Sequence, residues 1–260
     1  MDWSAVDVRV PHPSARLPGV SMAGFTQRAP GSFDISMVVH PSVTLLIDLS
    51  DGEGAIYDAY GSHERGSVAV GLLPRDFRAA GRQVDCLQIR LSPVALPDLR
   101  GLVVPLAEVW DCKDLEDRLR ATTSWDARFA IAAAALARRL DVTPSVDPEV
   151  AHIWRRTRRG RGRVRVEGLA EEVGWSRKRL WSRFRAQVGV SPKRAAGLVR
   201  FDHAVHLLAA GHPPAEVAAV AGYVDQSHLH REVRSFAGLT PTAVAAAPWL
   251  EIDDVAWPAS

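Results

Sequence analysis

The feature that most constrains this chain is an internal repeat in its C-terminal half, where a unit of about 49 residues occurs twice. Five residue pairs share this offset: Leu180 and Leu229, Phe184 and Val233, Arg185 and Arg234, Gly189 and Gly238, and Pro192 and Pro241. Chance rarely gives five such pairs at one offset. The segment from Val166 to Val244 is therefore expected to fold as two copies of one motif.

Each copy predicts a short helix, a glycine turn and a second helix. In the first copy, residues 168–173 form the short helix and Gly174 makes the turn, because positive φ costs glycine little. Ser176 then caps the second helix. The second copy has the same three parts, with a turn one residue longer. Its short helix is residues 214–220, its turn contains Gly222, and Asp225 caps its second helix. Helical spacing points six residues of the two second helices inward: Leu180, Phe184, Val188, Leu229, Val233 and Phe236.

The segment between the copies, residues 192–210, is expected to be one rigid helix despite Gly197. Its apolar stripe consists of Leu198, Phe201, Val205 and Leu208. At about 1.5 Å per residue the helix spans roughly 28 Å. Successive major-groove openings on one face of B-DNA lie ~34 Å apart. One chain then reaches two adjacent grooves.

The ends of both copies carry a more specific signal than the repeat itself. The first contains Gly189-Val-Ser-Pro192, and the second contains Gly222-Tyr-Val-Asp-Gln-Ser-His-Leu229 followed by Phe236-Ala-Gly-Leu-Thr-Pro241. These runs resemble the AraC/XylS family of bacterial transcription regulators, over about 100 residues from near Pro148 to near Ala246. One departure is visible. The aromatic and arginine pair usual in the family after the second Gly-x-Thr-Pro is replaced by Thr242-Ala-Val-Ala245.

The resemblance implies a sequence-specific DNA-binding regulator. In this family the partner domain is often a small β-barrel that senses a ligand, so the resemblance also implies a sensor in the N-terminal half. Beyond double-stranded DNA, the expected partners are a small-molecule effector, a second copy of the chain and, for an activator, RNA polymerase. The alternative is an architectural protein that binds DNA without sequence preference and whose N-terminal domain only oligomerises.

Charge divides the chain into three blocks. Residues 1–147 carry 15 basic and 19 acidic side chains, residues 148–247 carry 17 and 8, and residues 248–260 carry none and 3. Only the middle block has the basic excess of a module that neutralises phosphates. The 260 residues are enough for two domains, and 47% hydrophobic content is enough for a core in each.

The N-terminal half predicts short strands broken by glycine and proline. Candidate strands are residues 19–27, 35–40, 43–49, 55–60, 67–73 and 84–91, and Asp51-Gly-Glu-Gly54 is a candidate hairpin turn. This spacing is typical of an antiparallel sandwich or barrel. Tyr57 and Tyr60 are candidate pocket residues, with core packing as the alternative.

From Ser92 the chain turns helical, with short helices expected near residues 94–99 and 114–121. A longer helix is expected at residues 126–140, where Phe129, Ala132, Leu136 and Leu140 form one stripe and Trp125-Asp126 supplies a cap. It either packs on the β domain or also pairs two protomers. The fold class is therefore α+β, with a β domain at 1–140, a linker at 141–147, a helical domain at 148–247 and an acidic tail at 248–260.

Seven arginines lie close together at the start of the helical domain. They are expected to contact DNA phosphates without reading bases, or else to form a solvated face: Arg155, Arg156, Arg158, Arg159, Arg161, Arg163 and Arg165. The helix that begins this domain, residues 149–159, points Ile153 and Trp154 inward.

Base contacts are expected from the outward residues of the two recognition helices. Arginine and lysine suit guanine, glutamine suits adenine, and a phosphate contact is the alternative for each. The candidates are Arg177, Lys178, Trp181, Ser182 and Arg185 in the first copy and Gln226, Ser227, His228 and Arg231 in the second, with His230 as a further candidate. The Trp181 ring either packs on a thymine methyl group or folds back onto the helices.

Enzyme and metal-binding functions are not favoured. His12, His40 and His63 lack ligand partners at short spacing. No nucleophile elbow, Walker loop or dinucleotide fingerprint occurs, and Cys86 and Cys112 lack the arrangement of an alkyl-transferring repair protein. We expect no cofactor and two reduced thiols. With no apolar run of 18 residues and no signal peptide, a cytoplasmic, nucleoid-associated protein is expected.

Overall fold

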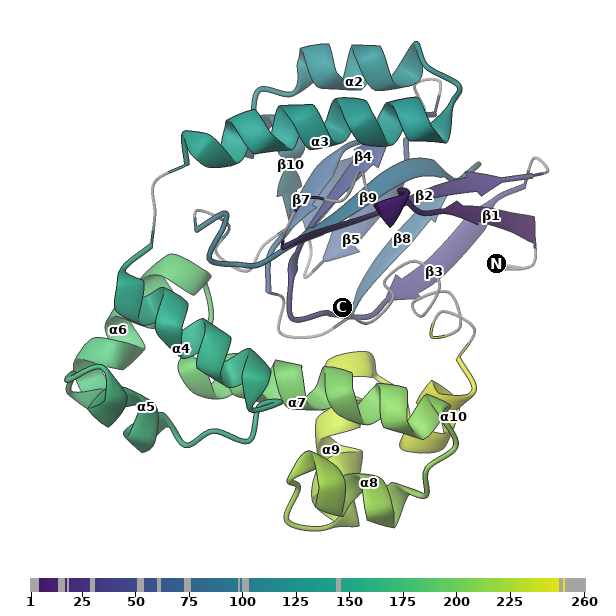
Figure 1. The fold of residues 1–260 in the computed structure, drawn as a ribbon. Coiled ribbons are helices and arrows are strands. Elements are labelled where there is room, and N and C mark those ends of the chain that lie inside the picture. The colour runs from purple at the N-terminus through teal and green to yellow at the C-terminus, as the bar shows by residue number, and fades with distance from the viewer. Residues whose placement is uncertain are drawn as a thin grey trace.

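The computed structural model describes residues 5–13, 17, 19–28, 31–50, 54–59, 62–72, 76–97, 99, 103–143, 146–247 and 250. It contains a β domain with flanking helices and an all-helical domain that lies beneath it in Figure 1. The predicted α+β, two-domain class is confirmed. An antiparallel sandwich and a barrel were both predicted for the β domain. In the described part, its strands form two separate antiparallel sheets and no closed barrel.

The two sheets divide the strands unequally. The larger has the order β1 (Val6–Arg9), β2 (Val20–Gln27), β9 (Asp85–Leu91), β4 (Val43–Asp48), β7 (Val68–Val70) and β10 (Val103–Pro105). The smaller has the order β3 (Phe33–Met37), β8 (Phe77–Gly81), β5 (Ile56–Ala59) and β6 (Ser62–Arg65). Because side chains alternate along a strand, the larger sheet has one face toward the helices and one toward the smaller sheet.

The six strands predicted from the sequence correspond to β2, β3, β4, β5, β7 and β9 with shifted ends, whereas β1, β6, β8 and β10 were not predicted. Strand β8 reads Phe-Arg-Ala-Ala-Gly, and alanine and glycine are poor strand formers. The predicted hairpin at 51–54 is wrong, because β4 pairs with β7 and β9 while β5 pairs with β6 and β8. Residues 51–53 and Tyr60 lie outside the described residues.

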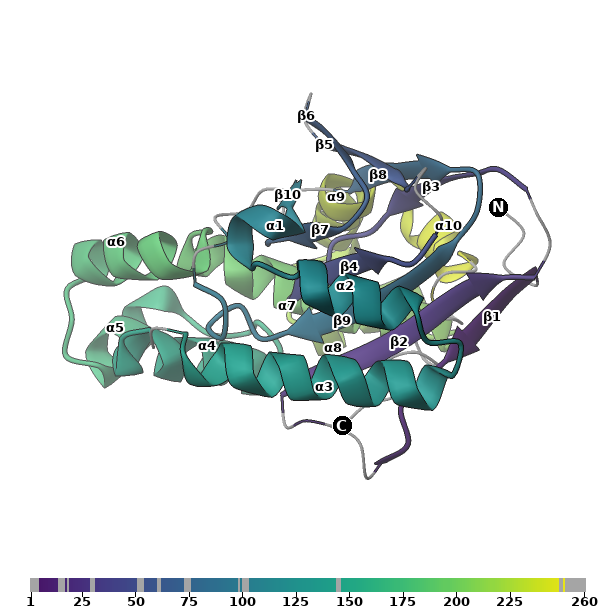
Figure 2. The same ribbon diagram turned by 90° about the horizontal axis from the view of Figure 1, so that it is seen from above.

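Three helices cover the outer face of the larger sheet: α1 (Leu106–Val109), α2 (Lys113–Arg120) and α3 (Trp125–Asp141) (Figure 2). The predicted stripe of α3 faces inward, with Phe129, Ala132 and Leu136 buried. Ser124 caps this helix by accepting a hydrogen bond from the Ala127 N–H at 3.5 Å, so the predicted cap at Trp125-Asp126 is wrong.

The short helix predicted near residues 94–99 is also wrong. Residues 93–97 form turns, and residues 98 and 100 lie outside the described part. Pro97 explains the difference, because a proline within a helix removes a backbone donor that the helix needs. The helix predicted near 114–121 is α2.

Helix α3 packs closely on the larger sheet at Gly24. A Cβ at this position would overlap the six-membered ring of Trp125. Gly24 therefore permits the indole to lie flat on β2, and the adjoining Arg128 guanidinium stacks 4.7 Å from the Trp125 ring.

We predict that Gly24→Ala lowers the free energy of unfolding by about 1–3 kcal/mol, because the added methyl displaces Trp125. Gly168→Ala is the control, since nothing lies within 4 Å of a Cβ at that position. In a helix the control change is expected to stabilise by up to about 1 kcal/mol. Urea denaturation of both variants measures the two effects, and equal stability of the Gly24 variant and the wild type would contradict the packing argument.

Both cysteines are free thiols, and neither is fully exposed. Burial, with the nearby carboxylates of Asp48 and Asp85, raises the pKa of the Cys86 thiol to about 12. Burial, with Glu116, raises the pKa of Cys112 to about 12.

Because only the thiolate is nucleophilic, we expect both thiols of the folded protein to resist iodoacetamide near pH 8. The same reagent should modify both rapidly in urea, where the thiols regain ordinary pKa values. Intact-mass spectrometry over time measures the two rates. Rapid alkylation of the folded protein would show that a thiol is exposed in solution.

The helical domain has seven helices in its described part: α4 (Pro148–Arg159), α5 (Val166–Glu172), α6 (Arg177–Val188), α7 (Pro192–Ala209), α8 (Pro214–Ala221), α9 (Gln226–Ala237) and α10 (Pro241–Ala245). Helix α6 and helix α9 begin and end 49 residues apart, as the repeat predicts. Ile153 and Trp154 of α4 are buried as predicted. No helix of the described residues is long and apolar enough to span a membrane.

The two domains touch at α7 through a short chain of polar groups. An Arg90 nitrogen of β9 lies 2.9 Å from His40 Nε2, and His40 Nδ1 lies 3.5 Å from an Asp202 carboxylate oxygen on α7. Burial opposes ionisation of Asp202, but His40, with His206 and Arg158, lowers its pKa overall. The β domain is thus linked to the helix that joins the two copies.

A second contact reaches the end of α9. The Asp76 N–H donates to the Phe236 carbonyl at 3.1 Å, and the Ser36 hydroxyl donates to the Asp76 carboxylate at 2.7 Å. The last carbonyls of a helix have no partner within it, so this bond satisfies one of them from the other domain.

Candidate nucleic-acid interface

The two recognition helices begin and end in the same way. The Ser176 hydroxyl accepts a hydrogen bond from the Arg179 N–H at 3.2 Å, and the Asp225 carboxylate accepts one from the His228 N–H at 2.6 Å. Gly189 and Gly238 end the helices with φ of 85° and 67°. The two caps at Ser176 and Asp225 were predicted from the sequence, and the four caps together fix where α6 and α9 begin and end.

The turn before each recognition helix contains a glycine with positive φ. Gly174 has φ of 66° and Gly222 has φ of 80°, where any other residue would be strained. Each turn therefore sets α5 against α6, or α8 against α9, at a defined angle, which is the helix-turn-helix arrangement.

The inner faces of both helices are buried against α7 and its neighbours. Leu180, Phe184, Leu229 and Val233 have no exposed surface, and Phe236 stacks on Phe201 of α7 with ring centroids 5.0 Å apart. Burying each of these side chains contributes on the order of 1.5–3 kcal/mol. The opposite faces of α6 and α9 are consequently left for solvent or for DNA.

Gly197 lies where α7 packs on α9. A Cβ there would already be in van der Waals contact, 3.7 Å from the Phe236 ring and from the Glu232 carboxylate. The glycine does not break α7, which continues from Pro192 to Ala209 as predicted.

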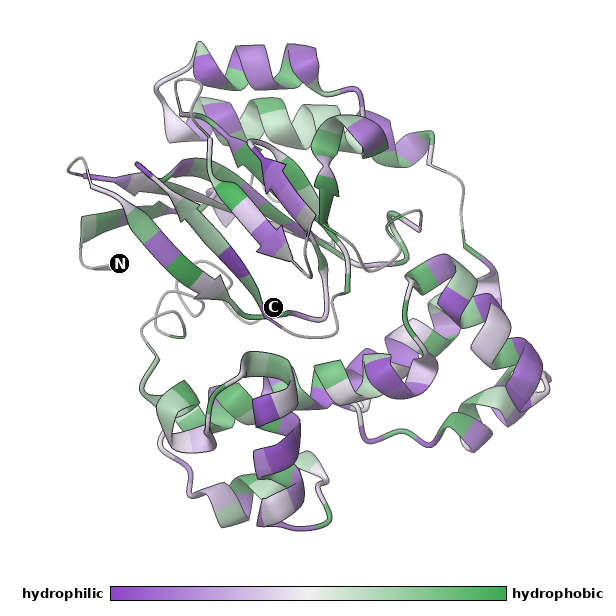
Figure 3. Ribbon diagram, turned by 180° about the vertical axis from the view of Figure 1, so that it is seen from behind, coloured by the Kyte–Doolittle hydropathy of each residue, from purple (hydrophilic) through white to green (hydrophobic). Residues whose placement is uncertain are grey.

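The two recognition helices lie on one side of α7, and α4, α5 and α8 lie on the other side (Figure 2). Seen from behind, the outward surface of α9 is largely hydrophilic (Figure 3). One face of the helical domain therefore presents both recognition helices.

All five candidates of the first copy are exposed on α6. The side chain of Trp181 does not fold back into the core, since 46% of it is exposed, and the Arg185 guanidinium lies 5.1 Å from its ring. Arg177 donates to the Glu167 carboxylate at 3.1 Å on the surface. Lys178 and Ser182 complete the set, and their contacts with bases stay predictions.

The candidate side chains of the second copy differ in how far they are exposed to solvent. Gln226, Ser227 and Arg231 are exposed, as is His230. The His228 ring is half-buried: its Nδ1 lies 3.4 Å from the Val224 N–H and its edge meets the Tyr223 ring at 5.2 Å. The fold already engages one nitrogen of this imidazole and packs the ring against Tyr223.

The arginine run is partly engaged within the protein. Arg156 donates twice to the Glu172 carboxylate, at 2.9 Å each, and together with His152 it lowers the Glu172 pKa to about 2. Arg163 donates to the Val220 carbonyl at 3.2 Å. The remaining arginines of the run that are exposed include Arg155, Arg159 and Arg165.

Sequence reasoning missed the ion pair that supports α9. Arg200 of α7 donates to both carboxylate oxygens of Glu232, at 3.0 and 2.6 Å, and its guanidinium lies 4.8 Å from the Tyr223 ring. Both charged side chains are mostly buried. The only sequence signal for this pair was a glutamate on α9, one turn after His228. Its partner could not be recognised, because Arg200 lies 32 residues away in the sequence.

We predict that Arg200→Met destabilises the protein by about 2–4 kcal/mol, since it leaves the Glu232 carboxylate buried without its cation. Arg118→Ala is the control, because it breaks an exposed pair with Asp114 and should cost less than about 1 kcal/mol. Thermal unfolding followed by circular dichroism compares the two variants. Equal effects would mean that the Arg200 pair is screened like a surface pair.

No group of three or more histidine, cysteine, aspartate or glutamate side chains within the described residues is placed to hold a metal ion.

Residues 169–247 match a protein family described as a helix-turn-helix domain. This segment is an AraC-type helix-turn-helix domain. The match covers both copies of the repeat, from α5 to the end of α10. The matched family is one of DNA-binding domains and not of enzymes.

A curated relative of the AraC-type domain is the uncharacterised HTH-type transcriptional regulator YbfI of Bacillus subtilis. It is 35% identical over 66 residues, which are 25% of this chain and 24% of the relative. The match thus spans about a quarter of that protein's length.

Solved structures of ToxT from Vibrio cholerae share the fold of the whole chain. One has a TM-score of 0.52 at 10% identity and covers 93% of this chain and 98% of its own. Another, bound to (E)-4-(8-methylnaphthalen-1-yl)but-3-enoic acid, has a TM-score of 0.51 with the same identity and coverage. The AraC-type domain and the β domain are therefore combined here in a known two-domain fold.

Proposed function

We propose that this protein is a sequence-specific transcription regulator whose helices α6 and α9 enter two adjacent major grooves. The observation that carries the proposal is the pair of equally capped recognition helices on one side of α7, each with an exposed polar face. An α-helix fits the major groove, where each base pair presents a distinct pattern of donors and acceptors.

The two copies differ in charge, and this suggests different roles. Residues 148–200 carry 15 basic and 4 acidic side chains, whereas residues 211–247 carry 2 and 3. Phosphate attraction therefore comes mainly from residues 148–200, which comprise the arginine run, the first copy and the first half of α7. The second copy, with little charge, contributes chiefly through base contacts, for which Gln226, Ser227 and Arg231 are the available side chains.

We also propose that a small molecule bound to the β domain controls DNA binding. The shared fold with ToxT, one structure of which holds a naphthyl-bearing carboxylic acid, supports a ligand-binding role. Control requires that the ligand bind one arrangement of the domains more tightly than another. The contacts at Asp202 and Phe236 are the places where such arrangements would differ. The same proposal includes a homodimer, contact with RNA polymerase, and a cytoplasmic location in association with the nucleoid.

We predict that Arg231→Ala weakens binding to a specific operator by about 1–3 kcal/mol and reduces the preference over scrambled DNA. Fluorescence anisotropy on an operator selected from genomic fragments, and on a scrambled fragment of equal length, measures both. Arg118→Ala, on α2 of the β domain, is the matched control and should change neither affinity.

The same assay at two salt concentrations tests the proposed function itself. A preference of about a thousandfold that persists at physiological salt supports a specific regulator. Equal affinities for both fragments that fall together as salt rises would support the architectural alternative instead. An equal loss on both fragments for the Arg231 variant would reduce this residue to a phosphate contact.

A further inference from the structure

The turn before α9 is one residue longer than the turn before α6, and the additional residue is Val224. In both turns the glycine is followed by a buried aromatic residue, Trp175 or Tyr223. Ser176, the cap of α6, follows Trp175 directly. Val224 instead separates Tyr223 from Asp225, the cap of α9. The first copy therefore has no counterpart of this side chain.

Val224 is the most exposed of the large apolar side chains in the part of the chain that the structure describes. It is 87% exposed, compared with 75% for Val142, which follows α3. A single exposed apolar side chain is common on protein surfaces and needs no partner for that reason alone. What distinguishes Val224 from Val142 is its position directly before a recognition helix.

The backbone of Val224 is held on both sides. Its N–H donates to His228 Nδ1 at 3.4 Å, and the Asp225 carboxylate accepts a hydrogen bond from the His228 N–H at 2.6 Å. On the other side, the Tyr223 ring lies 4.8 Å from the Arg200 guanidinium and meets the His228 ring edge-on. Because the turn is fixed in advance, little conformational entropy is lost when Val224 meets a partner.

The second copy has few charges with which to hold its half of a DNA site. Residues 211–247 carry 2 basic and 3 acidic side chains, so ion pairs with phosphates contribute little there. In a helix-turn-helix protein, the residues at the start of the recognition helix meet the base edges. Gln226 and Ser227 offer hydrogen bonds at this place, and Val224 beside them offers an apolar surface.

We infer that Val224 reads a thymine, through an apolar contact between its side chain and the 5-methyl group of that base. This methyl group is the apolar feature that thymine presents in the major groove, and aliphatic side chains are suited to contact it. The inference rests on the proposed function, because it requires that α9 enter a major groove. It adds an apolar contact to the polar ones proposed for the second copy.

The test removes the methyl group from the DNA, using deoxyuridine, which pairs as thymidine does but lacks the 5-methyl group. Each thymine of an operator selected from genomic fragments is replaced by deoxyuridine, one position at a time, and fluorescence anisotropy measures the affinity of the full-length protein. For the wild type we expect one position at which this replacement weakens binding about fourfold, the factor that corresponds to burying one methyl group.

Val224→Ala should weaken binding to the unmodified operator by a similar factor. The same deoxyuridine should then cause almost no further loss, because the two changes remove one contact and are not additive. Val220→Ala is the matched control. Val220 is also an exposed valine of the second unit, but it lies on α8, across α7 from the recognition helices (Figure 2). This control should keep the fourfold effect of the deoxyuridine.

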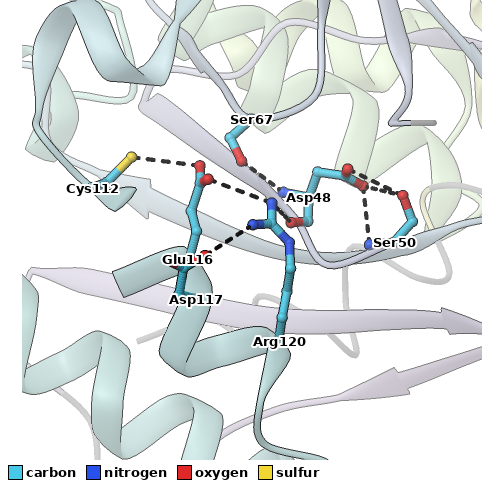
Figure 4. Close-up of polar contacts among 7 residues, drawn as sticks. All are labelled: Asp48, Ser50, Ser67, Cys112, Glu116, Asp117 and Arg120. Carbon is cyan, nitrogen blue, oxygen red and sulfur yellow. Dashed lines mark hydrogen bonds and ion pairs between the residues drawn. The ribbon is translucent and has the colours of Figure 1, made fainter. Parts of the chain in front are cut away.

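Ser50→Ala is the control for lost stability. The Ser50 hydroxyl donates to the buried Asp48 carboxylate at 2.8 Å in the β domain, in a cluster that also includes Arg120 of α2 (Figure 4). This variant should melt at a lower temperature and still keep the full effect of the deoxyuridine. Val224→Ala should melt with the wild type, since surface substitutions change stability little.

The possible results separate this contact from the proposed function. Suppose that the protein prefers the operator to scrambled DNA. The contact is then overturned if no deoxyuridine weakens binding of the wild type, or if the effect is equally large in the Val224 variant, while the regulator stands. Equal binding to the operator and to scrambled DNA would overturn the contact and the regulator together.

Discussion

The helical domain depends on the burial of one continuous helix, α7, between its two helix-turn-helix units. Phe201 stacks on Phe236 of the second unit, and Leu198 and Val205 are buried in the same cluster, which also contains Phe184 of the first unit. Because this core is close-packed, neither unit can rotate about α7 without opening a void. The positions of α6 and α9 are thereby set by packing, and their caps determine only where each helix begins and ends.

The second unit carries a polar arrangement that the first lacks. Arg200, Glu232 and Tyr223 join α7 to α9 and to the turn before it, and the His228 ring is packed beside them. At the equivalent position of the first unit, Arg183 pairs with Asp147 at the start of α4 instead. Both units therefore attach the recognition helix through an ion pair with two hydrogen bonds, but the partner residue lies on α7 in the second unit and at the start of α4 in the first.

Much of the helical domain could be predicted from the sequence, because its signals are local. A serine or aspartate cap, a glycine turn and apolar spacing all lie within one helix length, and the offset of 49 residues repeats them. The exposed faces of α6 and α9 followed from the same spacing. Contacts such as Arg200 with Glu232, and the internal use of His228, depend on how helices pack and left no local pattern.

The β domain was predicted less completely for the same reason. Strands β4 and β5 are adjacent in the sequence and yet belong to different sheets, so the turn between them looked like a hairpin. Strand β8 gains its structure from pairing with β3 and β5, and its own residues scarcely favour a strand. The pairing of β4 with both β7 and β9 could be recognised only once the three-dimensional structure was known.

The rigidity of α7 also has a consequence on the side of the DNA. A connector that cannot stretch or twist fixes the phase between the two half-sites, and one inserted base pair would turn one half-site by roughly a tenth of a helical turn. Binding sites for such a protein tolerate substitutions better than insertions. Under the proposed function, its genomic targets would share a single ungapped sequence pattern, written in one orientation because the two units are not identical.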